Sequence, residues 1–241
     1  MTDSQNKSSV SPTGHTSRTI STRSEIDSFL EKMTGTASTS GSSGRLIFGI
    51  DATGSRQPTW DIACQLQAEM FRETAAIGGL SVQLVYYRGT SECRASRWVS
   101  QPEHLAGLME RIKCRMGHTQ VGKILAHAKR ETQILKVQAL VFVGDAMEED
   151  PDTLSIDADE LGRLGVPAFM FQEGSSREVE HVFREIARLT HGAYCRFDPG
   201  AARQLAELLR AVAVYVAGGV TALAARRDAS AIKLLGQLKS A

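Results

Sequence analysis

The sequence has little of what marks secreted, membrane-spanning or nucleic-acid-binding proteins. Its N-terminal residues lack the apolar core of a signal peptide. Its longest apolar stretch, residues 211–225, is rich in alanine and glycine and short for a membrane span. The formal net charge is only +1, and nothing suggests the clustered basic face that binds nucleic acids. We therefore expect a cytoplasmic protein that binds neither membranes nor nucleic acids.

Cysteine is also scarce. The four cysteines form neither a CxxC pair nor the framework of a secreted disulfide-rich domain; they are Cys64, Cys93, Cys114 and Cys195. Cys114 precedes His118 by four residues, which could be half of a zinc site. Reduced thiols in a cytoplasmic protein explain the pattern more simply, and we expect that.

What is present suits one sizeable globular domain. The 241 residues are 42% hydrophobic and 23% charged. The first segment, 1–44, is rich in serine and threonine and poor in large apolar residues, so we expect a disordered tail with a possible short helix at 24–33. The domain proper is expected at 45–218. A C-terminal helical extension is expected at 219–241.

Within the domain, apolar runs alternate with helical patterns. The expected strands are 45–50, 80–87, 94–99, 139–143, 166–171 and 193–197. The expected helices are 59–77, one from Pro102 through Ile112, one from Val121, then 153–164, 177–189 and 201–217. This order predicts an α/β fold: a doubly wound, mostly parallel six-stranded sheet with helices on both faces and a short antiparallel edge strand at 94–99.

Two of these strands are followed at once by aspartates, Asp51 and Asp145. The carboxyl ends of parallel strands meet at one edge of a sheet, where such folds bind ligands. Thr53 and Ser55 follow Asp51 at alternate positions, and Thr119 lies at a helix start. Each residue alone is a common turn or cap residue. Together, their carboxylate and hydroxyl oxygens predict a site for Mg²⁺ or Mn²⁺.

The run Asp51-Ala52-Thr53-Gly54-Ser55, followed by Thr119 and then Asp145, resembles the metal-ion-dependent adhesion site of von Willebrand factor A (VWA) domains. The resemblance covers roughly residues 45–218 and includes the order of strands and helices. Thr53 replaces the family's first serine. Gly144-Asp145-Ala146 stands where the family often has Thr-Asp-Gly.

The resemblance implies a Rossmann-like VWA fold and a division of labour at the metal. Hydroxyls of Thr53, Ser55 and Thr119 would contact the ion, and Asp51 and Asp145 would act largely through water. The cation would then accept an aspartate or glutamate carboxylate from a protein partner. We expect a non-enzymatic, metal-dependent module for protein–protein interaction, and its compact, stand-alone form suggests a bacterial protein.

Two alternatives stay open. The stretch GDAMEED at 144–150 resembles haloacid dehalogenase-type phosphatases, in which Asp51 would be the nucleophile and Asp145 and Asp150 would hold Mg²⁺. Thr53 stands against it, because those enzymes usually carry an acid at that position. The other alternative is a metal-free scaffold with the same fold. Glu148, Glu149 and Asp150 are expected to be a solvated approach to the next helix.

Overall fold

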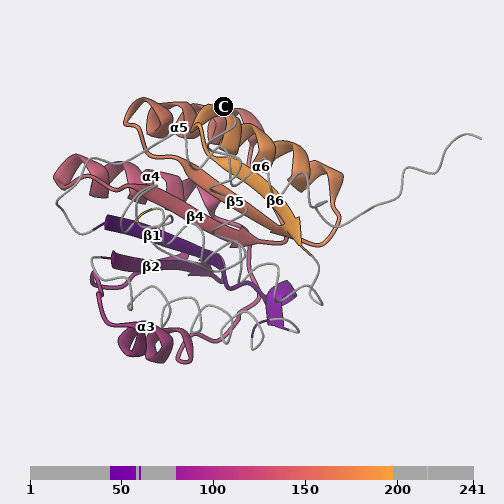
Figure 1. The fold of residues 1–241 in the computed structure, drawn as a ribbon. Coiled ribbons are helices and arrows are strands. Elements are labelled where there is room, and N and C mark those ends of the chain that lie inside the picture. The colour runs from indigo at the N-terminus through magenta and orange to yellow at the C-terminus, as the bar shows by residue number, and fades with distance from the viewer. Residues whose placement is uncertain (1–43, 58–59, 61–79, 198–215, 217–241) are drawn as a thin grey trace, which may run out of the picture.

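A six-stranded sheet with helices on both faces makes up the described part of the chain (Figure 1). The computed structural model describes residues 44–57, 60, 80–197 and 216. Several predictions lie outside these residues, apart from Gly44, Trp60 and Val216: the tail at 1–44, the helices at 24–33, 59–77 and 201–217, and the extension at 219–241.

The strand order in the sheet is β3-β2-β1-β4-β5-β6. The strands are β1 (Gly44–Asp51), β2 (Leu80–Arg88), β3 (Glu92–Ala95), β4 (Ala139–Gly144), β5 (Ala168–Glu173) and β6 (Ala193–Phe197). Every neighbouring pair is parallel except β2 and β3. The predicted doubly wound sheet with one antiparallel edge strand is therefore confirmed.

The edge strand begins and ends earlier than predicted, at Glu92–Ala95 instead of 94–99. The Ser96 hydroxyl accepts the Leu84 N–H at 3.0 Å, where a regular ladder would use a backbone carbonyl. A side chain thus interrupts the ladder, and only an isolated bridge between Val82 and Val99 follows.

β5 lies two residues later than the predicted 166–171. Pro167 has no backbone N–H to add to the sheet, although its carbonyl accepts the Leu140 N–H at 2.9 Å. At the other end, the strand continues through two buried polar residues, Gln172 and Glu173. Because buried strands are usually apolar, the sequence did not indicate that the strand continues through these two residues.

The described helices are η1 (Gly54–Arg56), α3 (Pro102–Met109), α4 (Val121–Ile134), α5 (Pro151–Arg163) and α6 (Arg177–Leu189). α4, α5 and α6 cover one face of the sheet and α3 lies on the other (Figure 1). The bounds of α6 are those predicted. α5 begins two residues earlier than predicted, because Asp150 caps it by accepting the Thr153 N–H at 3.1 Å.

The core consists of two apolar layers, one on each face of the sheet. All residues of β1, β4 and β5 are buried, which explains their nearly continuous apolar runs. Leu105 and Met109 of α3 pack into one layer, and Ile124 of α4 and Phe183 of α6 pack into the other. Burial of each such side chain contributes about 1.5–3 kcal/mol. The packed central strands hold the ends of β1 and β4 side by side.

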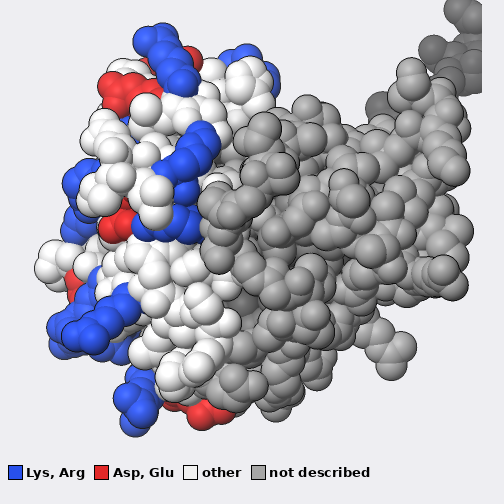
Figure 2. Space-filling view, turned by 60° about the vertical axis from the view of Figure 1, so that its left-hand side comes forward, with Lys and Arg blue, Asp and Glu red and all other residues white. Residues whose placement is uncertain are grey.

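None of the described helices is long and apolar enough to cross a membrane. On the face shown in Figure 2, lysine and arginine side chains form several separate groups with uncharged surface between them.

Candidate functional site

Asp51 ends β1 at the carboxyl edge of the sheet, and its side chain is buried. One carboxylate oxygen, Oδ1, accepts the Thr53 N–H at 2.7 Å. The other, Oδ2, accepts the hydroxyl of Tyr87 at 3.0 Å, from the paired position on β2. Burial raises the pKa of Asp51 to about 6, although these bonds lower it. The carboxylate is thus fixed in place and has little contact with solvent.

Thr53 and Ser55 lie next to each other just after Asp51. Their hydroxyl oxygens are 3.1 Å apart, because the short helix η1 turns the chain between them. Gly54 separates the two residues, and a β-carbon there would come within 2.7 Å of the Met116 sulfur. Glycine at this position lets the loop at 114–119 approach closely. The two hydroxyl groups that the sequence suggested as metal ligands therefore lie side by side.

Thr119 lies at the end of that loop and is buried. The loop runs beside the end of β1, since the Arg115 N–H donates to the Ala52 carbonyl at 3.0 Å. The Thr119 hydroxyl accepts the Glu148 N–H at 2.8 Å, and the Thr119 N–H donates to the Glu148 carboxylate at 3.1 Å. A hydroxyl has two lone pairs, so the Thr119 oxygen keeps one acceptor position.

Asp145 follows β4, the strand next to β1. Its Oδ1 atom is buried and has no hydrogen-bond partner among the described residues. A β-carbon at Gly144 would lie 3.4 Å from the Asp51 β-carbon, which shows how closely the two strand ends approach. Burial is the main reason why the pKa of Asp51 is raised, and the negative charge of Asp145 raises it further. Two neighbouring carboxylates, one with an unsatisfied oxygen, form a place that favours a cation.

Arg56 lies beside the candidate site but was not among the residues predicted for it. Only 1% of the residue is exposed, and its guanidinium pairs with Glu173 at the end of β5. Burial lowers the pKa of Arg56, and the charges of Asp145 and Asp51 oppose this. Arg56 therefore brings a positive charge into the same cluster of carboxylates. The sequence carried little signal, because Glu173 lies beyond the predicted end of β5.

In the acidic run after Asp145, Glu148 and Asp150 are exposed, as expected of a solvated approach to α5, whereas Glu149 is half-buried and supports α4. The carboxylate of Glu149 accepts the Gly122 N–H at 2.9 Å and also the Val121 N–H, so it caps α4 from another segment. Glu148 is more exposed, yet it binds the backbone of Thr119 as described. The loop at 114–119 is thereby tied to the segment after β4.

Cys114 and His118, considered for zinc, belong to no metal-binding cluster in the described part of the chain. Within residues 44–57 and 80–197, no three histidine, cysteine, aspartate or glutamate side chains come together as a metal cluster. His118 is largely exposed, and its Nδ1 lies 3.2 Å from Glu148.

The predicted residues thus come from three segments at one edge of the sheet. Asp51, Thr53 and Ser55 are connected directly, and Asp145 lies beside Asp51. Thr119 is tied to the segment that follows Asp145. The chemistry of this donor set, two carboxylates with hydroxyls, fits a hard cation such as Mg²⁺. That these residues bind a metal ion stays a prediction.

The sequence matches no protein-family model and no curated protein. Its structure, however, is similar to solved structures of VWA domains. A von Willebrand factor type A protein from Catenulispora acidiphila is 18% identical with a TM-score of 0.59; the match covers 73% of this chain and 44% of that one. The SpRpn10 VWA domain is 14% identical with a TM-score of 0.54, covering 70% and 93%.

The vWF domain of the type V pili tip protein Mfa5 from Porphyromonas gingivalis is 10% identical with a TM-score of 0.56, covering 72% of this chain and 95% of that one. The chain therefore spans less than half of the Catenulispora protein and most of the other two domains. Identities this low concern the architecture alone, and by its strand order and these matches the chain has the fold of a von Willebrand factor A domain.

Proposed function

We propose that the chain is a non-enzymatic protein-binding module that depends on a divalent cation, Mg²⁺ or Mn²⁺. The ion would be held by Asp51, Thr53, Ser55, Thr119 and Asp145. The observation that carries the proposal is the buried Oδ1 of Asp145, which lacks a hydrogen-bond partner among the described residues and lies near a second buried carboxylate. An unsatisfied buried carboxylate oxygen is unfavourable, and a bound cation would satisfy it.

The hydrogen bonds of the site support a division of labour among its residues. Both oxygens of Asp51 already accept protein hydrogen bonds, which suits contact with a cation through water. The adjacent hydroxyls of Thr53 and Ser55 are neutral donors for direct contact. A cation with mostly neutral direct ligands keeps its attraction for anions. It would therefore accept an aspartate or glutamate side chain from a protein partner.

The structural neighbours support protein binding as the role of this fold. One of them, SpaC from Lactobacillus rhamnosus GG, is a pilus adhesin, 8% identical to this chain with a TM-score of 0.54. Adhesion is a property of that protein, and its extension to this chain is part of the proposal.

A metal-free scaffold is the second candidate, and Arg56 favours it. A buried guanidinium paired with Glu173 and close enough to interact with Asp51 and Asp145 supplies positive charge without an ion. In that case partner binding would not respond to a chelator.

The phosphatase alternative fits the contacts less well. The exposed carboxylate of Asp150 accepts both the backbone N–H and the hydroxyl of Thr153, at 3.1 and 2.6 Å, and so caps α5. Two positions after Asp51, where those phosphatases usually carry an acid, this chain has Thr53, whose hydroxyl is hydrogen-bonded to that of Ser55.

Co-purification of the tagged full chain from native cells, with Mg²⁺ or with EDTA, tests the proposal. We expect a partner that is retained in Mg²⁺, lost in EDTA, and lost with Asp145→Ala. Asp159→Ala is the control, because Asp159 is a partly exposed acid of α5 that pairs with Arg163. Retention in EDTA and by Asp145→Ala would favour the metal-free scaffold. Release of phosphate from an aryl phosphate that Asp51→Asn abolishes would favour the phosphatase.

A further inference from the structure

The edge strand β3 has one side without a neighbour among the described residues. It ends the sheet order and pairs only with β2. An edge strand presents backbone N–H and C=O groups that another chain can pair with. Partners of many proteins bind in this way, by adding a strand to an open edge.

A groove runs between β3 and α4. It has a volume of about 350 Å³, and its α4 wall is formed by Lys123, Ala126, His127 and Arg130. These four positions have the spacing of one helical face. Arg94 and Ala95 of β3 form the facing wall. The small side chains at 95 and 126 leave room between the strand and the helix.

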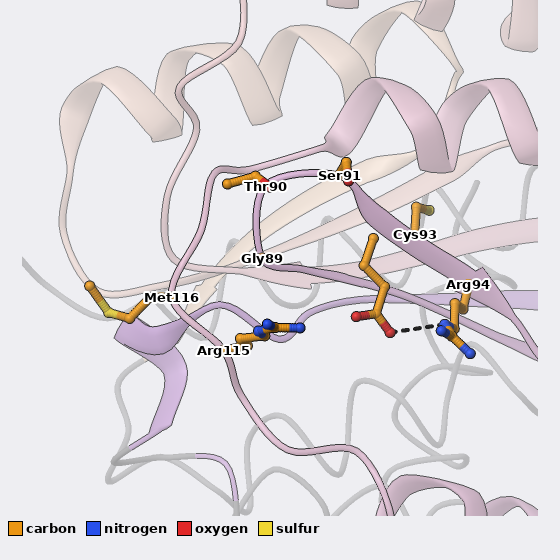
Figure 3. Close-up of a pocket in the computed structure, with 8 residues that line it drawn as sticks. Gly89, Thr90, Ser91, Cys93, Arg94, Arg115 and Met116 are labelled. Atoms are coloured by element: carbon orange, nitrogen blue, oxygen red, sulfur yellow. Dashed lines mark ion pairs between the residues drawn. The ribbon is translucent and has the colours of Figure 1, made fainter.

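A second hollow, of about 570 Å³, continues the groove around the turn between β2 and β3. Both hollows are lined by Ser91, Cys93 and Arg94, so they adjoin along the strand. Figure 3 shows Arg115 reaching from the loop at 114–119 into this hollow, on the side of β3. Thr90 and Ser91 add hydroxyl groups at the turn.

The rim of the two hollows is basic. Its exposed cations are Arg94, Arg115, Lys123 and Arg130. The one acid that lines them is Glu92, and its carboxylate is shared by Arg88 at 3.1 Å and Arg94 at 2.9 Å. Positive charge therefore exceeds negative charge along the open edge. The complement of such a rim is an acidic ligand.

We propose that this β3–α4 groove binds an extended acidic segment of a partner protein, which adds as a strand beside β3. Its acidic side chains would meet the basic rim, and alternate apolar side chains would lie against Ala95 and Ala126. No phenylalanine, tyrosine or tryptophan side chain lines either hollow. Single-stranded nucleic acids usually need such side chains for base stacking, so a peptide suits the groove better. This site uses no metal and none of the five residues proposed to hold the ion, but its second hollow borders the proposed adhesion site through the loop at 114–119.

Fluorescence polarisation with a short labelled peptide of alternating glutamate and valine tests the proposal, with the full chain in EDTA. We expect saturable binding that weakens as salt is raised, because exposed ion pairs are screened. The double variant Arg94→Glu, Arg130→Glu should weaken binding by about tenfold or more, since the two substitutions reverse two positive charges that face the acidic peptide. Arg163→Glu is the control, because Arg163 is, like Arg94, a largely exposed arginine with an acidic partner.

A peptide methylated on alternate backbone nitrogens separates strand addition from simple charge attraction. We expect the methylated peptide to bind at least tenfold more weakly, because it cannot donate those hydrogen bonds to β3. Equal binding of the methylated peptide, equal binding of an oligonucleotide of similar charge, or no effect of the double variant would each overturn the proposal. Asp145→Ala should bind the peptide as well as the unchanged protein does, so the failure of one site is distinguishable from the failure of the other.

Discussion

Replacing Arg56 by methionine tests whether its positive charge compensates the negative charge of the carboxylates at the sheet edge. Methionine keeps a long apolar side chain in the buried position but removes the charge. Glu173, Asp51 and Asp145 then lose the guanidinium that pairs or interacts with them. Removal of one member of a buried ion pair destabilises a protein by about 3–5 kcal/mol, because the other charge stays buried without compensation. We expect a loss of this size in the free energy of unfolding, measured in EDTA.

The assay is urea denaturation followed by circular dichroism. Arg163→Met is the control, and it should change the free energy of unfolding by less than about 0.5 kcal/mol, because Arg163 is exposed. The double variant Arg56→Met, Glu173→Gln should recover part of the loss, since it removes a charge that Arg56→Met leaves unpaired.

If Asp51 and Asp145 bind Mg²⁺, adding the ion should also raise the free energy of unfolding of Arg56→Met. A ligand that binds only the native state stabilises it by about 2.7 kcal/mol at a hundred times its dissociation constant. A loss of less than about 1 kcal/mol for Arg56→Met in EDTA would refute the reasoning, because the guanidinium would then not be balancing buried charge.

Three further predictions concern the site and its support. Burial raises the pKa of Asp51 from 3.8 to about 6, so the folded metal-free protein holds this proton more tightly than the unfolded chain. The free energy of unfolding in EDTA should therefore fall by about 2 kcal/mol as pH rises from 4 to 6, and Asp51→Asn should remove this slope in urea denaturation. Glu149→Ala should weaken the cap of α4 and lower the free energy of unfolding by about 1–2 kcal/mol. Hydrogen exchange of the Val121 and Gly122 amides should become faster, and unchanged exchange would show that the cap is unimportant. Phe183→Ala should open a cavity in the core beneath α6, which lowers the melting temperature and reduces the free energy of unfolding by about 3–5 kcal/mol. The affinity for Mg²⁺ should stay unchanged, and an altered affinity would contradict this.

The sequence was sufficient for the elements whose patterns are local. The apolar run of β4 and the 3.6-residue periodicity of α6 are complete within their own segments, so their predicted bounds agree closely with the structure. The ends of β3 and β5 were less predictable. Ser96 interrupts one strand by a bond to Leu84, and the buried Glu173 extends the other because it meets Arg56. Both effects depend on a residue far away in the chain.

The same distinction applies to the candidate site. Asp51, Thr53 and Ser55 could be proposed because they follow a recognisable strand within a few residues. The cap on α4 by Glu149 joins positions 27 and 28 residues apart, and no local pattern indicates it. Arg56 is harder still, since an arginine in a turn is expected at the surface. Its burial follows only from the assembled sheet edge.

Isothermal titration calorimetry with Mg²⁺ and Mn²⁺ tests the central claim most directly. The unchanged full chain is compared with Asp145→Ala and with the control Asp159→Ala. We predict that the unchanged chain and Asp159→Ala bind a single ion with the same affinity, and that Asp145→Ala shows no measurable binding while its circular dichroism spectrum is unchanged. No binding of either ion to the unchanged chain, or equal binding by Asp145→Ala, would contradict a metal-dependent site at the carboxyl edge of the sheet.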